Sequence, residues 1–142
     1  MSYWRLFYHI VWATKERLPL IDPAWETKLH GYIRGKATAL ECIVHAVGGM
    51  PDHVHVVLSI PPKLAVATVV GKLKGASSHH ISEQLISDGE FAWQNEYGVL
   101  SFSESGLGKI VAYVNNQKQH HAENRLNATL ESIQLIGQFV TS

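Results

Sequence analysis

Two histidines, His53 and His55, flank a single valine in the run Pro51-Asp52-His53-Val54-His55-Val56-Val57-Leu58. The β-branched residues of this run predict a β-strand. Because residues i and i+2 of a strand point to the same face, both imidazoles can reach one metal ion. Such a pair could polarise a phosphate or activate a water, provided that the chain supplies a third ligand and a reacting group. Taken alone, however, the pair is more typical of hydrogen-bonded structural histidines.

A second polar set lies in residues 109–124, where the sequence predicts a helix. Tyr113 and Gln117 are four residues apart, so they lie one above the other on a single helix face. His120 and Asn124 continue this stripe. A lone helical tyrosine is usually a core residue. Together with the two strand histidines, however, the phenol and the amide oxygen make a ligand set with open positions and a nucleophile.

This set of groups is suited to cleaving a phosphodiester bond. A divalent ion held by His53, His55 and Gln117 would polarise the phosphate, and the Tyr113 oxygen would attack phosphorus to give a phosphotyrosine. Since a free phenol has a pKa near about 10, Tyr113 needs a base or a nearby cation, and the sequence does not identify that base. The phosphotyrosine conserves the energy of the broken bond, so a free 3′-hydroxyl can reverse the step. This chemistry suits transposition or recombination better than degradation.

The elements that must position these residues are predicted in the order β-α-β-β-α-β-α. The strands are expected at residues 3–13, 42–47, 53–60 and 97–103, and the helices at residues 22–40, 66–87 and 109–124. The second and third strands should form an antiparallel hairpin, because a string of turn-forming residues separates them. The first six elements match the split βαβ arrangement. We therefore expect an α+β, ferredoxin-like (RRM-like) antiparallel sheet with helices on one face, followed by a C-terminal catalytic helix.

Length and composition predict one domain over residues 1–142, since the 142 residues are 46% hydrophobic. Residues 1–124 would form the core, and residues 125–142 fit either a short helix or a tail that docks on a partner. Lys plus Arg and Asp plus Glu number 12 each, so any basic surface must be local. The chain has neither an apolar stretch of spanning length nor a signal-peptide pattern, which predicts a cytoplasmic protein with no membrane partner. Cys42, in an apolar run, is expected to be a buried thiol.

Three blocks of the sequence carry a resemblance to a known family. They are Tyr8-His9-Ile10-Val11-Trp12-Ala13-Thr14-Lys15, Gly49-Met50-Pro51-Asp52-His53-Val54-His55 and Tyr113-Val114-Asn115-Asn116-Gln117-Lys118-Gln119-His120-His121. In this order, they resemble the single-tyrosine (Y1) HUH transposases of the IS200/IS605 type, including relatives associated with repetitive extragenic palindromes (REP). The resemblance implies that His53 and His55 bind the metal, that Gln117 is the third ligand and that Tyr113 is the nucleophile.

The same resemblance implies a substrate, a cofactor and an assembly. The substrate would be single-stranded DNA with hairpins at the element ends, and the cofactor a divalent metal, Mg²⁺ or Mn²⁺. The assembly would be a homodimer in which the tyrosine helix of one subunit can complete the site of the other. Gly106 and Gly108 stand where such a helix would need a hinge, although they fit an ordinary loop equally well.

Several side chains are candidates for DNA contacts. Those expected to reach phosphates are Lys15, Arg17, Lys72, Lys74, His79 and His80. A solvated surface is an equal alternative for each of them. His120 and His121 are candidates for positioning DNA or assisting the metal site, or for packing against the sheet. Trp93 and Phe102 could stack on unpaired bases, but aromatic residues of a small domain more often belong to its core.

Two other functions compete with the transposase hypothesis. The His53-Val54-His55-Val56-Val57 run partly resembles the histidine-triad nucleotide hydrolases, but position 57 is valine where a third histidine would stand. That hypothesis also leaves Tyr113 and Gln117 unexplained. The other alternative is a catalytically retired domain that binds hairpins or single-stranded nucleic acid. Such a domain would not need all four chemical residues.

Overall fold

A computed structural model describes residues 2–86, 91–123 and 126–133 of the chain. Its sheet has four antiparallel strands in the order β2-β3-β1-β4. The strands are β1 (Phe7–Ala13), β2 (Ile43–Met50), β3 (His53–Ser59) and β4 (Gly98–Phe102). The antiparallel pairing of β2 with β3 confirms the predicted hairpin. The predicted α+β, ferredoxin-like class is confirmed by this sheet and the helices packed on it.

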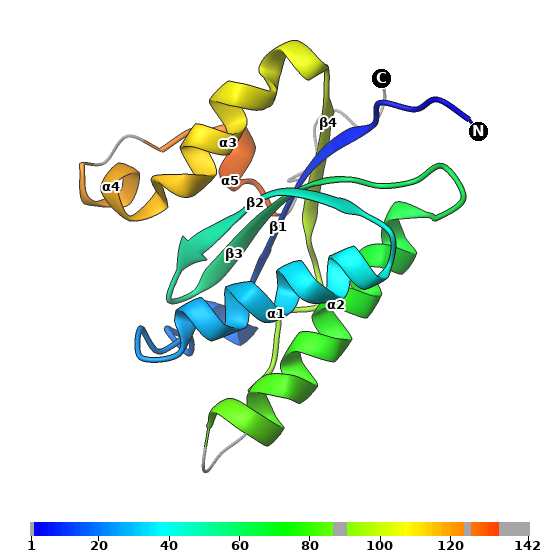
Figure 1. The fold of residues 1–142 in the computed structure, drawn as a ribbon. Helices are drawn as coiled ribbons and strands as arrows, with labels where there is room; N and C mark the ends of the chain where they lie inside the picture. Colours follow the sequence, from blue (N-terminus) through cyan, green and yellow to red (C-terminus); the bar gives the residue numbers. More distant parts are fainter. Residues whose placement is uncertain (1, 87–90, 124–125, 134–142) are drawn as a thin grey trace.

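Helices cover both faces of the sheet (Figure 1). The first face packs against α1 (Glu26–Ala39) and α2 (Val66–His80), and the π-helical turn Ile81–Leu85 continues α2. The opposite face packs against α3 (Leu107–Asn115), α4 (Gln117–Ala122) and α5 (Ala128–Glu131). The central strands β1 and β3 are therefore buried on both sides. All seven residues of β3 are buried, the two histidines included.

Alternation along the strands sends different residues to the two faces. Toward α1 and α2, the two central strands present the apolar side chains Ile10, Trp12, Val54, Val56 and Leu58. They pack with fully buried helix residues that include Leu29, Ile33, Val69 and Leu73. Toward α3, α4 and α5, the same two strands present His9, Val11, His53, His55 and Val57. One face thus holds the main hydrophobic core, and the other holds the histidines.

Two glycines let backbone segments approach the histidine face closely. A β-carbon on Gly48 of β2 would overlap the backbone carbonyl oxygen of Val114 in α3. A β-carbon on Gly98 of β4 would overlap the carbonyl oxygen of Ser132, just after α5. Glycine is therefore required at both positions for α3 and α5 to lie where they do.

The helix predicted over residues 109–124 is not continuous. It begins earlier, at Leu107, and breaks at Asn116, whose φ of −112° and ψ of 27° separate α3 from α4. The Asn116 side-chain amide donates to the Ala112 carbonyl oxygen at 2.7 Å. The Asn116 backbone N–H donates to the same carbonyl oxygen at 3.1 Å, so the side-chain bond adds to the helical bond and does not replace it. The predicted end of the helix at Asn124 lies outside the described residues.

Other predicted boundaries also move. The first strand begins at Phe7 instead of residue 3, and β2 extends to Met50, so Gly48 and Gly49 belong to the strand. In the segment predicted as a helix or a tail, residues 128–131 form the short helix α5, and residues 134–142 lie outside the described residues. The assignment of residues 1–142 to a single domain stays a prediction.

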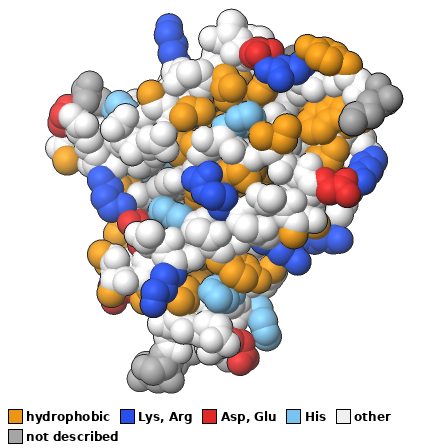
Figure 2. All heavy atoms as spheres, viewed as in Figure 1, with side chains coloured by type: hydrophobic (Ala, Val, Ile, Leu, Met, Phe, Trp, Pro, Cys, Tyr) orange, Lys and Arg blue, Asp and Glu red, His pale blue; other side chains and the backbone are white. Residues whose placement is uncertain are grey.

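The surface is mixed in charge. On the face drawn in Figure 2, the described lysine and arginine side chains are dispersed, several of them close to acidic groups. This distribution agrees with the equal counts of basic and acidic residues. Within the described parts of the chain, we find no helix with the length and apolar character needed to span a bilayer.

Candidate active site

The histidine pair lies at the centre of the sheet, on the face covered by α3, α4 and α5. His53 and His55 are 2% and 0% exposed, and their ring centroids are 5.0 Å apart. Strand β1 lies beside them, because His55 pairs with Val11 and His53 with Ala13 in the antiparallel register. The two imidazoles therefore lie on the same face of the strand, as predicted.

Each imidazole is held through its Nδ1 atom. His53 Nδ1 lies 2.6 Å from the Asp52 carboxylate, and His55 Nδ1 lies 2.8 Å from Nε2 of His9. Both Nε2 atoms then point toward the same space between the sheet and the helices over it. Outer partners of this kind fix the ring orientation of metal-binding histidines.

Gln117 meets His53 from the first turn of α4. Its Oε1 atom lies 3.2 Å from His53 Nε2 and 3.0 Å from His121 Nε2, and the side chain is buried. The neighbouring Lys118 anchors α4, since its ammonium contacts Glu26 of α1 at 2.7 Å and the Gly49 carbonyl oxygen at 3.2 Å. The break at Asn116 thus leaves Gln117 at the site even though the helix is not continuous.

Glu131 is a site residue that the sequence did not indicate. Its Oε1 atom lies 3.3 Å from His53 Nε2 and 3.2 Å from His55 Nε2. Asn127 caps α5 by accepting a hydrogen bond from the Leu130 backbone N–H at 3.2 Å. Buried Leu130 and Ile133 hold this segment against the sheet. Their spacing was the available signal for a short helix, but it did not mark Glu131 as part of the site.

Tyr113 approaches the same carboxylate from α3. Its hydroxyl donates to Glu131 Oε2 and accepts the backbone N–H of Asn127 at 3.0 Å. The ring is 8% exposed and stacks on His120, with centroids 4.7 Å apart. Burial and the bond to anionic Glu131 raise the pKa of the Tyr113 phenol. The tyrosine is thus held in its neutral form beside the histidine pair.

The charges of the site are tightly linked. Burial opposes a charge on His53, but its bonds to Asp52 and Glu131 outweigh burial and raise its pKa to about 9. Burial alone would raise the pKa of Glu131, yet the bonds from His53 and His55 hold it far below its usual range. Burial is the main reason why the pKa of His9 falls to about 3 and that of His55 is also lowered. Burial therefore favours the uncharged form of both rings.

The donor set fits a divalent metal ion. One ligand atom each from His53, His55 and Glu131 lies within 4.8 Å of the others. The amide oxygen of Gln117 adds a fourth donor on the same side of His53. Two imidazoles with two oxygen donors suit a transition ion such as Mn²⁺, while Mg²⁺ prefers oxygen ligands. The structure therefore contains a possible metal-binding site, in which Glu131 joins the three ligands that were predicted from the sequence.

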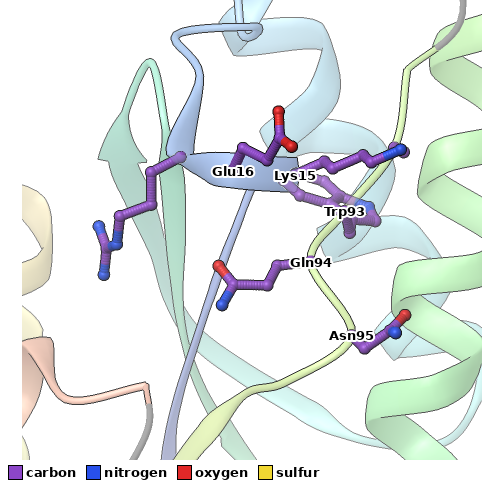
Figure 3. Close-up of a pocket in the computed structure, with 7 residues that line it drawn as sticks. Lys15, Glu16, Trp93, Gln94 and Asn95 are labelled. Atoms are coloured by element: carbon purple, nitrogen blue, oxygen red, sulfur yellow. The ribbon is translucent and has the colours of Figure 1, made fainter.

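A pocket of about 680 Å³ opens next to the turn after β1 (Figure 3). Its lining includes Lys15 and Arg17 from the turn after β1, and Gln94 and Asn95 from the segment leading into β4. Arg17 also lies 3.8 Å from Asp52, the carboxylate that holds His53. Two of the predicted DNA contacts are therefore close to the histidine strand.

The other predicted DNA contacts lie elsewhere, except for His120, which stacks on Tyr113. They are the α2 residues Lys72, Lys74, His79 and His80, across the sheet from the tyrosine. Lys74 donates to the backbone carbonyl oxygens of Gln94 and Glu96, and His80 stacks on Tyr32 with centroids 4.0 Å apart. These two side chains are thus engaged within the chain, whereas Lys72 and His79 are exposed.

The remaining aromatic candidates belong to packed clusters. Trp93 is 9% exposed, donates its indole N–H to Ser77 at 2.9 Å and meets Trp12 edge-on. Phe102 packs against the cluster beneath α3. Cys42 is buried, as expected. Packing within the chain thus accounts for both aromatic rings.

Known proteins resemble this chain over most of its length. The sequence model of the family described as "Transposase IS200 like" matches residues 2–117. The chain is 32% identical over 123 residues to the ISDra2 transposase TnpA of Deinococcus radiodurans, covering 80% of this chain and 85% of that protein. It is 29% identical over 121 residues to the transposase for insertion sequence element IS200 of Salmonella typhimurium, covering 84% and 79% of the two chains.

Solved structures share the fold as well. A crystal structure of a Deinococcus radiodurans protein assigned as a transposase has a TM-score of 0.66 and 30% identity, covering 82% of this chain and 95% of that one. The structure of a REP-associated tyrosine transposase bound to a REP hairpin has a TM-score of 0.60 and 13% identity, covering 99% and 96%. At that low identity the second likeness concerns the fold alone.

Proposed function

This chain belongs to the IS200-like transposase family, and we propose that it cleaves single-stranded DNA and joins the cut strand elsewhere through a tyrosine-linked intermediate. The observation that carries the proposal is the position of Glu131. Its two carboxylate oxygens connect the Tyr113 hydroxyl with the Nε2 atoms of His53 and His55. A nucleophile and a set of metal ligands thus lie at one site, which supports a mechanism with a tyrosine nucleophile.

In the proposed reaction, the Tyr113 oxygen attacks the phosphorus of a DNA phosphodiester. The bond from phosphorus to the 3′-oxygen breaks, and that oxygen leaves as a 3′-hydroxyl after taking up a proton. The product is a 5′-phosphotyrosine on the protein. A different 3′-hydroxyl can then attack the same phosphorus and release Tyr113, so the strand is rejoined without an outside energy source.

The side chains around Tyr113 have separate roles in this proposal. Glu131 is the group placed to accept the phenolic proton, since its Oε2 atom already accepts the hydroxyl's hydrogen bond. His53, His55, Gln117 and Glu131 would hold a divalent ion, Mg²⁺ or Mn²⁺. When bound, that ion supplies a Lewis acid that stabilises negative charge on the phosphate. His120 stacks on the tyrosine ring and restricts its orientation.

We propose hairpin-bearing single-stranded DNA as the substrate. The family membership supports this choice, and one relative of the same fold is bound to a REP hairpin. The strand near the cleaved bond would lie along Lys15 and Arg17, beside the pocket in Figure 3. Contacts by Lys72, Lys74, His79 and His80 would have to involve DNA on the α2 side, away from the tyrosine. We place this activity in the cytoplasm.

The decisive experiment is the capture of the covalent adduct. Labelled single-stranded hairpin DNA is incubated with the protein and Mg²⁺ or Mn²⁺, and the products are separated under denaturing conditions. Wild type should form a labelled protein band, and Tyr113→Phe should not. Tyr32→Phe is a matched control, because Tyr32 lies on α1 across the sheet and stacks on His80. If Tyr113→Phe formed the adduct at the wild-type rate, the nucleophile would be misassigned. Hairpin binding by wild type without any adduct would instead identify a catalytically retired binding domain.

We also propose a homodimer with shared active sites. Within the described chain, Tyr113 faces the histidines of its own sheet. The test therefore asks whether Tyr113 can also act together with the histidines of the partner subunit. A His53→Ala, His55→Ala variant is mixed with a Tyr113→Phe variant, and adduct formation is followed. Restored activity in the mixture would mean that the tyrosine acts across the dimer. A monomer by light scattering, with no restoration, would contradict the proposal.

A further inference from the structure

His9 is a buried histidine for which the proposed chemistry has no use. It lies in β1, is 1% exposed, and projects to the same face of the sheet as His55. Its Nε2 atom is 2.8 Å from Nδ1 of His55, and the two ring centroids are 5.0 Å apart. A buried pair of imidazoles at this distance shares a hydrogen bond, so one ring must donate and the other accept.

The protons of His9 and His55 can be arranged in two ways. His55 Nε2 faces the Glu131 carboxylate at 3.2 Å, and a carboxylate only accepts, so this Nε2 carries the proton. His55 Nδ1 is then an acceptor, and His9 must donate to it. A metal ion on Nε2 would need that lone pair, so the proton would have to sit on Nδ1. His9 would then have to accept.

We propose that His9 is a positioning residue that lets His55 exchange one tautomer for the other. When the His55 Nε2–H donates to Glu131, His9 donates from its Nε2 to His55 Nδ1. When a metal ion occupies the Nε2 side, the His55 Nε2 proton is released, the shared proton passes from His9 to His55 Nδ1, and His9 takes up a proton at its own Nδ1, so both rings stay neutral. An imidazole can play both parts, so the buried hydrogen bond between His9 and His55 is kept in either arrangement. This inference rests on the metal site proposed above.

The partner of the other histidine makes the contrast clear. His53 Nδ1 faces the Asp52 carboxylate at 2.6 Å, which can only accept. The proton on His53 Nδ1 is therefore fixed, and Nε2 is the only nitrogen of this ring that gains or loses a proton. On its Nδ1 side, His55 meets the imidazole of His9 where His53 meets a carboxylate. The two metal-binding histidines are thus oriented by different means.

The test compares metal binding and tautomers in three variants. His9→Leu removes the partner, His9→Gln restores a group that can donate and accept, and His45→Leu is the control. His45 is a partly buried histidine of β2 that bonds Ser59 at 2.9 Å, outside the site. Mn²⁺ affinity is measured by calorimetric titration, and the His55 ring nitrogens are followed by ¹⁵N NMR with and without Mg²⁺.

We expect His9→Leu to weaken Mn²⁺ binding by about 10- to 100-fold, as losses of outer partners commonly do. His9→Gln should recover most of this affinity, and His45→Leu should keep all of it. In wild type, the proton of His55 should move from Nε2 to Nδ1 when Mg²⁺ is added. Equal Mn²⁺ affinity in His9→Leu and wild type, or a proton that stays in place, would overturn the role of His9. Failure of wild type itself to bind Mn²⁺ would instead show that the metal site is wrong. If His9→Leu does not fold, His9→Gln and the wild-type NMR still decide the question.

Discussion

The two faces of the sheet are packed in different ways. On the face toward α1 and α2, apolar side chains of the strands meet apolar side chains of the helices, and Leu29 and Ile33 are fully buried there. On the opposite face, the backbone of α3 lies directly against Gly48, and the backbone after α5 lies against Gly98. Side-chain packing holds α1 and α2 on the sheet, whereas close backbone contact sets the distance of α3 and α5 from the sheet.

This difference shows how a small domain can hold a polar site. Buried histidines and a buried carboxylate gain little from hydrophobic burial, so their face contributes less stability per residue than the apolar face. In return, the glycines let α3 and α5 come close enough for Tyr113 and Glu131 to reach the histidines. The apolar face stabilises the fold, and the histidine face arranges the groups that would react. Substitutions on the two faces should therefore have separable effects.

The largest effect should come from removing the histidine pair. In His53→Ala, His55→Ala, adduct formation should fall by about 1000-fold or more, because polarising the phosphate contributes several kcal/mol. Mn²⁺ should also lose its stabilising effect on thermal unfolding. His45→Ala, in the same sheet, should keep both properties. Wild-type adduct yield in the double variant would place the chemistry away from this strand.

The next largest effect belongs to the apolar face. Leu29→Ala should lower the free energy of unfolding by about 2–5 kcal/mol, because it leaves a cavity in the main core. Mn²⁺ affinity of the folded protein should not change. Urea unfolding measures the first quantity and calorimetric titration the second. A loss of Mn²⁺ affinity in the folded variant would mean that the two faces are not separable.

On the histidine face, Gly48→Ala should destabilise the protein by about 1–3 kcal/mol through overpacking. Because the added methyl group pushes α3 away, Tyr113 should also move and adduct formation should fall. Urea unfolding and the adduct assay follow the two effects. Full activity together with full stability would show that α3 can shift without consequence.

A smaller change is expected for Glu131→Gln. The amide keeps the shape and one oxygen ligand but removes the negative charge between the histidines. Mn²⁺ affinity should fall by about tenfold, which corresponds to about 1.4 kcal/mol. Glu123→Gln, outside the metal-ligand set, serves as a control. Unchanged affinity in Glu131→Gln would remove Glu131 from the proposed ligands.

The smallest effect should be a gain. Gly71 is an exposed position inside α2, with no atom within 4 Å of where a β-carbon would stand. Gly71→Ala should raise the free energy of unfolding by about 0.5–1 kcal/mol through helix propensity. The same substitution is thus expected to help at Gly71 and to harm at Gly48. Equal effects at the two positions in urea unfolding would contradict the contrast between the faces.

Local patterns were enough to predict the strands and the broad fold. The β-branched run around His53 and His55 marks a strand by itself, and the turn residues before it mark a hairpin. The spacing of Tyr113 and Gln117 placed them on one side of a helical segment, and the structure brings them to the histidines. Each of these features depends on residues close together in the sequence.

Other features depend on contacts between distant segments. Glu131 reaches the site because Ser132 lies against Gly98, a contact that no pattern near Glu131 reveals. His9 meets His55 only through the register of β1 against β3. The break at Asn116 separates α3 from α4 although the Asn116 backbone N–H keeps its helical bond to Ala112, so no local pattern predicts it. A single sequence does not show which distant segments come into contact.

The close contact of Val114 with Gly48 bears on how fast subunits could exchange the tyrosine helix. In a dimer that swapped α3 and α4, each chain would give up this contact and the ion pair of Lys118 with Glu26, and would then regain both from its partner. The two forms would be nearly equal in free energy, while the barrier between them would contain every contact broken on the way. Swapped and unswapped molecules would then interconvert slowly. The ratio of swapped to unswapped molecules in a sample would then depend on how the protein had assembled.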